Sequence, residues 1–236
     1  MRRIIILSIL VLCLTPAWGQ AVVILDQSFT NDEHLWAFVH HSPDSESYYP
    51  KAQTFTVGVS GVLTSIELEL GGLFFDPDPP GNFSLDLLTT DAEGVPTLNS
   101  LATIISPLAS LPASSYSWIG FDFSSFNLDV TAGEVLAIEI GIPDPLVVDN
   151  FIPGISWLGS SSGFPPTYAY GDAYYLAEDS NFVTLKSSFS FDTPDEMDLV
   201  FKTYVDTTSV PEPSTIVLLG LGLVGLAGFG RKKFKK

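Results

Sequence analysis

Five aromatic residues lie close together in the second half of the chain, and their side chains could bind a sugar. They are Trp157, Tyr168, Tyr170, Tyr174 and Tyr175. Aromatic rings offer flat apolar faces to a sugar ring, and the tyrosine hydroxyl suits a surface that stays wet. The sequence therefore predicts a glycan-binding site here. The alternative is packing, because aromatic residues are also enriched in β-strands.

Two acid-rich segments, residues 76–78 and 192–198, could bind a hard cation. Proteins hold calcium with clustered carboxylate and carbonyl oxygens, which such segments contain. Neither segment has the D-x-D-x-D-G spacing of an EF-hand loop, and solvated turns are the alternative interpretation. Calcium is thus the one cofactor that the sequence allows, and we assign no metal-ligating residue.

Motifs that carry enzymatic chemistry are missing from the sequence. The histidines are His34, His40 and His41, and no H-E-x-x-H, C-x-x-C or G-x-S-x-G spacing occurs. His40 and His41 are adjacent, so on an extended chain their side chains point to opposite sides. Glycoside hydrolysis needs only two carboxylates about 5–10 Å apart, but such a pair carries little information in so acidic a chain. We predict no catalytic residue, and a small glycan-active hydrolase is an alternative function.

Charge is distributed very unevenly along the chain. Between residues 20 and 210 there are 26 acidic side chains and only three basic ones, Lys51, Lys186 and Lys202. Such a surface repels nucleic acid and anionic lipid, because phosphate binding depends on clustered Lys and Arg. It suits a soluble extracellular protein, a protein that meets cations, or one that meets neutral polymers. The alternative is that the charge only maintains solubility.

The first 19 residues have the pattern of a secretory signal peptide. Arg2 and Arg3 precede an apolar run over residues 4–14, which predicts a signal helix. Small residues predict cleavage after Gly19, with cleavage after Ala21 as the alternative. The single cysteine lies in this segment, so the mature protein would contain no disulfide.

The C-terminal segment, residues 207–236, has the order of a stop-transfer signal. Pro211, Glu212 and Pro213 form an extended stretch, since proline disfavours helix in the residue before it. The apolar residues 216–230 predict a single transmembrane helix of about 22 Å, shorter than the ~30 Å hydrocarbon core of a bilayer. The basic residues that follow would hold the far end in the cytoplasm. These are Arg231, Lys232, Lys233, Lys235 and Lys236.

The segment VPEPSTIVLLGLGLVGLAGFGRKKFKK resembles the PEP-CTERM sorting signal of Gram-negative bacteria. The resemblance implies that an exosortase, a membrane-bound processing enzyme, recognises Pro211, Glu212 and Pro213 and cleaves nearby. It also implies that the five basic residues are the cytoplasmic anchor. The protein would be anchored transiently in the inner membrane and would then reach the cell surface or the exterior. An ordinary permanent tail anchor is the alternative.

Between the two ends, short runs of β-branched and aromatic residues alternate with turn residues. Apolar and polar side chains alternate in residues 63–70 and again in residues 135–140, where Glu139 falls on the polar side. This pattern predicts strands with one buried and one wet face. The predicted strands cover residues 21–25, 52–57, 63–70, 83–88, 101–105, 117–123, 135–140 and 197–205.

Many short strands without helical patterns between them predict an all-β fold, an antiparallel β-sandwich of the jelly-roll type. The N-terminal signal helix and the C-terminal transmembrane helix complete the chain. The predicted domains are the signal peptide at 1–19, the β-sandwich at 20–206 and the sorting tail at 207–236. The middle region contains, in this order, the segments AQTFTV, VLTSIELEL, LDLLTTDAEGVPT, SWIGFDFSSFNLDVTAGEVLAIEI and DLVFKTYV. These segments resemble jelly-roll modules of bacterial surface proteins, which are often similar to carbohydrate-binding domains.

These features predict an exported, non-catalytic protein of the cell surface or extracellular matrix that is sorted by an exosortase. Exopolysaccharide is the candidate ligand of its sandwich domain. The alternative is a structural or adhesive surface protein with calcium-aided contacts. The expected partners are the exosortase, the inner membrane for a limited time and exopolysaccharide, whereas nucleic acid is not expected.

Overall fold

A computed structural model describes residues 22–30, 35–41, 48–73, 81–113, 115–143, 154–161, 168–177, 180–187 and 195–207. Within this part of the chain, Val23–Asp206 forms one compact unit made of strands and two short 3₁₀ helices. The 3₁₀ helices are η1 (Leu108–Ser110) and η2 (Ser124–Phe126). All the strand pairs within the sheets are antiparallel.

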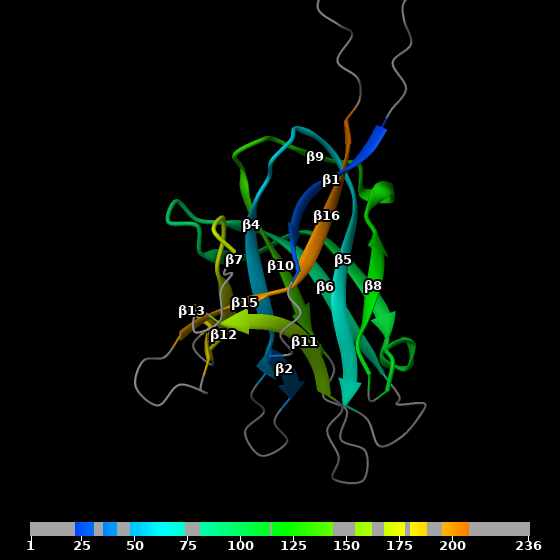
Figure 1. Cartoon of the computed structure of the whole chain (residues 1–236), viewed down its shortest axis with the longest axis vertical. Coiled ribbons are helices and arrows are strands. Elements are labelled where there is room, and N and C mark those ends of the chain that lie inside the picture. The colour runs from blue at the N-terminus through cyan, green and yellow to red at the C-terminus, as the bar shows by residue number, and fades with distance from the viewer. Residues whose placement is uncertain are drawn as a thin grey trace, which may run out of the picture. The chain divides into compact units, whose positions relative to one another are not determined.

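The larger sheet has ten strands, of which six follow the order β1-β16-β5-β11-β15-β14 (Figure 1). Strands β8 and β9 pair with β5, and β2 joins β11 to β3. The strands are β1 (Val22–Phe29), β2 (Leu35–His41), β3 (Tyr48–Tyr49), β5 (Gly61–Leu73), β8 (Ser117–Asp122), β9 (Leu128–Val130), β11 (Gly154–Ser161), β14 (Lys186–Ser187), β15 (Asp195–Leu199) and β16 (Phe201–Thr207).

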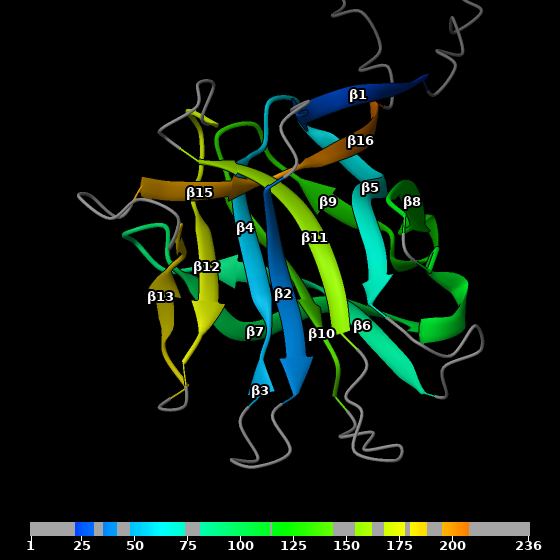
Figure 2. The same ribbon diagram turned by 60° about the horizontal axis from the view of Figure 1, so that its bottom comes forward.

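The smaller sheet has six strands in the order β13-β12-β4-β10-β6-β7, which Figure 2 shows from below. They are β4 (Lys51–Thr56), β6 (Asn82–Thr90), β7 (Pro96–Pro107), β10 (Val135–Gly141), β12 (Ala173–Leu176) and β13 (Phe182–Thr184). Residues 131–134 connect β9 to β10, and Gly133 takes a φ of 89° there. Glycine adopts this left-handed conformation without the steric cost that other residues incur.

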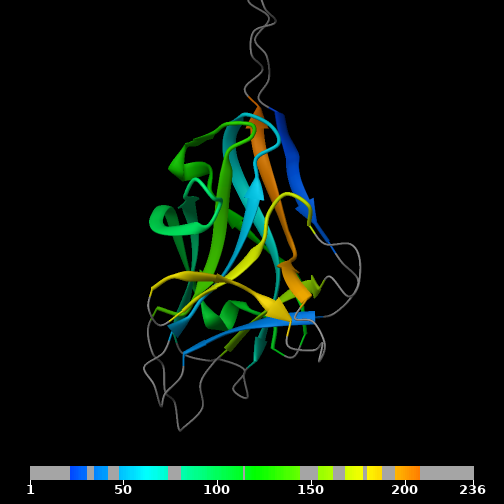
Figure 3. The same ribbon diagram turned by 90° about the vertical axis from the view of Figure 1, so that its left-hand side faces the viewer.

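The two sheets pack against one another around one apolar core. Figure 3 shows the ribbon from the side. Rings from opposite sheets meet in this core: Phe55 lies 5.8 Å from Phe201 and Phe83 lies 6.1 Å from Phe121 between ring centroids. The alternation in β5 places Ile66, Leu68 and Leu70 on the buried side. Apolar alternation in both sheets therefore produces a β-sandwich, because each sheet buries one face against the other.

The first and last strands of the described chain are neighbours in the larger sheet, blue β1 beside orange β16 in Figure 1. Thr207 Oγ1 at the end of β16 donates a hydrogen bond of 3.2 Å to the carbonyl oxygen of Val22 at the start of β1. Thr203, further back in β16, accepts a hydrogen bond of 3.1 Å from the backbone N–H of Gln27. The first and last described residues of the chain, Val22 and Thr207, are thus adjacent.

The structure confirms the all-β prediction and the antiparallel sandwich, and each predicted strand overlaps an observed one. The predicted strand 197–205 is in fact two strands. At Val200 the chain passes from β15, which pairs with β11, to β16, which pairs with β5. Seven observed strands were not predicted: β2, β3, β9, β11, β12, β13 and β14. The jelly-roll order and the domain boundaries stay predictions, and both predicted terminal helices lie outside the described residues.

Candidate functional site

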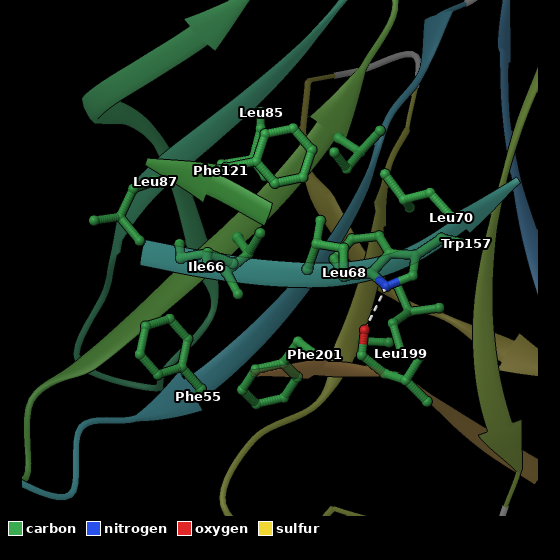
Figure 4. Close-up of a cluster of buried hydrophobic side chains, with 14 of the residues drawn as sticks. Phe55, Ile66, Leu68, Leu70, Leu85, Leu87, Phe121, Trp157, Leu199 and Phe201 are labelled. Carbon is green, nitrogen blue, oxygen red and sulfur yellow. Dashed lines mark hydrogen bonds between the residues drawn. The ribbon is translucent and has the colours of Figure 1, made fainter. Parts of the chain in front are cut away.

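Trp157 is a core residue and not part of a sugar-binding surface, which corrects the sequence-based prediction. Its side chain is fully buried on β11, among Leu68, Leu70 and Leu199 in Figure 4. The indole Nε1 donates a hydrogen bond of 2.8 Å to the carbonyl oxygen of Val200. A buried indole normally finds such a partner. A ring enclosed on both faces cannot stack on a sugar.

Tyr168 and Tyr170 meet at the edge of the core, but only one of them faces solvent. Their rings lie 5.9 Å apart in an edge-to-face arrangement. Tyr168 is buried against Phe201, and its hydroxyl donates to Gln27 Oε1 at 3.0 Å. Burial raises the pKa of Tyr168 above its usual range, which keeps the phenol neutral. Tyr170 is 65% exposed and is the one predicted glycan-binding residue that offers an open ring.

Tyr174 and Tyr175 are consecutive in β12 and therefore point to opposite faces of the smaller sheet. Tyr174 pairs with Ala52 and is buried on the outward face. Tyr175 pairs with Lys51, whose Nζ lies 5.6 Å from the Tyr175 ring centroid and donates to the carbonyl oxygen of Tyr49 at 3.1 Å. Burial lowers the pKa of Lys51 to about 8. The five predicted aromatic residues thus do not form one binding face.

Asp198 is buried inside the sandwich. It is therefore not the exposed calcium ligand that the acid-rich segment 192–198 suggested. Its Oδ1 accepts a hydrogen bond from Gln53 Nε2 at 3.3 Å and its Oδ2 accepts one from the backbone N–H of Tyr168 at 3.0 Å. Gln53 Oε1 in turn accepts from the backbone N–H of Leu199 at 2.6 Å. This buried network ties β4 of one sheet to β15 of the other. Residues 76–78 lie outside the described part of the chain.

A row of directly paired residues crosses the outward face of the smaller sheet, and we call it the carboxylate row. It runs across β12, β4, β10, β6 and β7. Its members are Tyr174, Ala52, Glu139, Asp86 and Thr103. Opposed side chains on antiparallel strands have Cβ atoms about 4.5–5.5 Å apart, so the two carboxylates are neighbours.

Glu139 is buried, which corrects the prediction that this position faces water. Its side chain is only 8% exposed, because β10 is a central strand and the adjacent outward residues Ala52 and Leu88 are buried as well. Among the residues that the structure describes, Glu139 Oε2 has no hydrogen-bond partner. Burial, and to a smaller extent the charge of Asp86, raise the pKa of Glu139 to about 8. A strongly shifted carboxyl beside a second one is a typical sign of a functional site.

The outward face of the larger sheet carries a different polar group, which we call the lysine patch. It comprises Lys202 and Tyr204 on β16, Glu67 on β5 and Trp118 on β8. Lys202 Nζ lies 3.2 Å from Glu67 Oε2 and 3.7 Å from the Trp118 ring centroid. The Tyr204 hydroxyl donates to the same Glu67 oxygen at 3.1 Å. Every charge in this patch has a partner.

Sequence reasoning missed both outward groups, although one signal was available. In residues 117–123, Trp118 alternates with Ile119 and Phe121, which pair with the buried Leu68 and Ile66 of β5, whereas Trp118 pairs with Glu69. That pattern alone assigns Trp118 to the outward face. Nothing comparable singles out Asp86, since its neighbour Glu139 is distant in sequence.

The described residues contain no group of three or more His, Cys, Asp or Glu side chains that could hold a metal.

The remaining predicted site residues are in the C-terminal tail, outside the residues that the structure describes. Among the described residues, no helix is long and apolar enough to cross a membrane. His34 also lies outside this part, and for His40 and His41 the structure describes only the backbone of β2. The tail is therefore assessed by its sequence and by comparison with known families.

Residues 209–232 match the model of the PEP-CTERM protein-sorting motif. The chain carries this sorting motif. The match includes Pro211, Glu212 and Pro213 and the whole apolar run, and it ends with Arg231 and Lys232. No curated protein matches the chain. The motif indicates a surface protein sorted by an exosortase, with export and transient membrane anchoring before surface display.

Proposed function

We propose that this chain is an exported, non-catalytic protein of the bacterial cell surface or extracellular matrix, released from its tail by an exosortase. The match of residues 209–232 to the sorting motif carries this proposal. Processing near Pro211 and Pro213 would remove the apolar run and the basic end, and signal cleavage after Gly19 would remove the other apolar run. An acidic β-sandwich would be left outside the cell.

The arrangement of the first and last strands supports display of a folded domain. Val22 and Thr207 are joined by a hydrogen bond, so both processing sites are attached to adjacent strand ends. Only a short segment separates the end of β16 at Thr207 from Pro211. A domain held by one such tether can fold and expose its sheets before the tail is cut.

A non-catalytic function fits the neighbours of the carboxylate pair. The side chains nearest to Glu139 and Asp86 in the described sheet include Ala52, Ser100 and Thr103. Glycosidases hold their substrate between paired carboxylates and distort the sugar toward the transition state. No aromatic side chain among the described residues flanks this pair directly, since Tyr174 lies across β4. If the protein hydrolyses the producer's polysaccharide and the Glu139→Gln variant does not, the proposed non-catalytic function is wrong.

Exopolysaccharide is the ligand that we propose for the sandwich, and Tyr170 supports it most directly. Tyr170 is 65% exposed, and its ring makes an edge-to-face contact with the buried Tyr168. A rigid, exposed tyrosine binds at low cost in conformational entropy. Retention of the mature protein on the producer's own exopolysaccharide should fall severalfold in Tyr170→Ala. Equal retention of the Tyr170→Ala and wild-type proteins would remove Tyr170 from the proposal, and no retention of either would favour the adhesive alternative.

The processing route is tested by the intact mass of the protein in cells with and without the exosortase. In wild-type cells we expect a mature protein that has lost both its signal segment and its basic end. Replacing Pro211 and Pro213 by alanine should leave the basic end in place and keep the protein in the membrane fraction. Pro143 and Pro145 flank an aspartate in the domain and form a matched control, whose replacement should leave processing unchanged. A mature wild-type protein that still carries Lys236 in the presence of active exosortase would overturn the proposal.

A further inference from the structure

The carboxylate row leaves one buried oxygen without any partner. Glu139 is 8% exposed, and its Oε2 receives no hydrogen bond. Burying an ionised carboxylate without compensation costs several kcal/mol, so buried carboxylates are normally paired, hydrogen-bonded or bound to a cation. Either a proton or a cation bound by Glu139 would remove this cost.

The side chains around this oxygen are rich in further oxygen atoms. Asp86 lies directly opposite Glu139. Its Oδ1 accepts hydrogen bonds from the hydroxyls of Thr103 and Ser100, the latter at 3.2 Å. These two hydroxyls also lie 3.2 Å from one another. They hold the Asp86 carboxylate in place while its other oxygen, Oδ2, accepts no hydrogen bond from the described residues.

Neither lysine side chain that the structure describes neutralises this pair. Lys51 pairs with Tyr175 and Ile140, on the opposite face of the same sheet. Lys202 belongs to the lysine patch on the other sheet, where it pairs with Glu67. The titratable group that faces Glu139 in the carboxylate row is Asp86, and its negative charge adds to the cost of ionising Glu139.

We propose that Glu139 and Asp86 bind a hard divalent cation, Ca²⁺ in preference to Mg²⁺ or Zn²⁺, between Glu139 Oε2 and Asp86 Oδ2. Carboxylate oxygens are the ligands that Ca²⁺ favours, and Ca²⁺ tolerates an irregular set completed by water. Zn²⁺ prefers imidazole and thiolate ligands, and neither occurs in the row. Ser100 and Thr103 act as positioning residues that orient Asp86. The site belongs to the sandwich and does not depend on how the tail is processed.

A bound cation and a bound proton compete for Glu139, which makes the site testable by pH. Glu139 must be deprotonated to bind the cation, so the cation and a proton exclude one another at this carboxylate. Ligands that must be deprotonated bind metals more tightly as the pH rises. The apparent affinity for Ca²⁺ should therefore increase between pH 6 and pH 8.5.

The experiment measures thermal unfolding of the mature exported protein in Ca²⁺ and in chelator. At a Ca²⁺ concentration of about 100 times the dissociation constant, we expect the Tm to rise by about 5–10 °C at pH 8. Glu139→Gln should lose this rise, while its Tm in chelator at pH 8 should equal or exceed that of the wild type. That second readout separates loss of a ligand from simple damage to the fold.

Glu67→Gln is the matched control, because it removes one carboxylate from the outward face of the other sheet and should keep the full Tm rise. Asp86→Asn gives an independent test and should reduce the rise by more than half, even if Glu139→Gln does not fold. The proposal is overturned if Ca²⁺ does not raise the wild-type Tm. It is also overturned if the rise is the same in Glu139→Gln as in the wild type, because calcium then binds elsewhere and the pair shares a proton instead.

Discussion

The outward faces of the two sheets both carry carboxylates but satisfy them differently. In the lysine patch, Glu67 receives a cation from Lys202 and a hydrogen bond from Tyr204, and the Lys202 and Glu67 side chains are 24% and 32% exposed. In the carboxylate row, Glu139 is 8% exposed, faces Asp86 and has an oxygen without a partner. The first face supplies its own compensating charge. The second requires a proton or a ligand, which is why we locate binding chemistry there.

Substitutions in the core between the two sheets should change the free energy of unfolding more than substitutions on either outward face. Trp157→Ala should lower the free energy of unfolding by about 3–5 kcal/mol, because it leaves a cavity and removes the hydrogen bond to Val200. Trp157→Phe should cost less, since it keeps most of the apolar volume. Denaturant unfolding of the mature protein measures both changes. A loss below 1 kcal/mol for Trp157→Ala would contradict the assignment of this residue to the core.

The pH dependence of stability tests the carboxylate row. Glu139 has a higher pKa in the folded protein, about 8, than its ordinary value of 4.5. The folded state therefore holds this proton more tightly, and the free energy of unfolding should fall as the pH rises from about 4.5 to 8. In chelator the loss should be on the order of 4 kcal/mol. It should be greatly reduced in Glu139→Gln.

Lys51 limits the useful range of that measurement, which should end at pH 8. Burial lowers the pKa of Lys51 from 10.5 to about 8. Above pH 8 the contribution of Lys51 to the free energy of unfolding therefore rises with pH, whereas that of Glu139 falls as the pH rises toward 8. The comparison is therefore the wild type minus Glu139→Gln between pH 5 and pH 8. Parallel pH profiles of the two proteins would show that Glu139 is not the buried acid that we describe.

The lysine patch should be much less sensitive. Lys202→Met should cost about 1 kcal/mol, because exposed ion pairs contribute about 0.2–1 kcal/mol and a cation–π contact a similar amount. A double-mutant cycle with Glu67→Gln should give a coupling of about 0.5 kcal/mol that weakens in high salt. A coupling above 2 kcal/mol that persists in 1 M salt would mean that this face is as desolvated as the other.

Tyr170 should have the smallest effect on stability. Tyr170 is 65% exposed, so Tyr170→Ala should change the free energy of unfolding by no more than about 0.5 kcal/mol. The same variant is therefore suited to binding experiments, since any loss of retention on polysaccharide would not reflect unfolding. A loss of stability above 1.5 kcal/mol would place Tyr170 in the packing of Tyr168 instead of on a free surface.

Strand positions were predictable because alternation is a local property of the chain. The alternation of residues 63–70 predicted the buried side of β5 correctly, and all predicted strands were found. The same rule predicted the wrong exposure for Glu139, which is buried. A residue on the face opposite the core is exposed to solvent only where no other part of the protein packs over it. It also could not show that the chain changes partner at Val200 between β15 and β16.

The candidate sites were less predictable than the strands. Of the five aromatic residues that were expected to bind a glycan, the core contains Trp157 and Tyr168, and consecutive positions in β12 separate Tyr174 from Tyr175. Composition and proximity in sequence do not distinguish a buried ring from an exposed one. The Glu139–Asp86 pair depends on the register of β10 against β6, which no local pattern specifies.

By itself the sequence determined the sorting motif at residues 209–232, the acidic middle region and the pattern of strands. Each is written in contiguous residues or in overall charge, so each can be recognised without the fold. Only the tertiary structure decided which side chains are enclosed and which groups face one another. Gln53 and Asp198 are 145 residues apart and share a hydrogen bond, because strand pairing and sheet packing join positions that the linear chain separates.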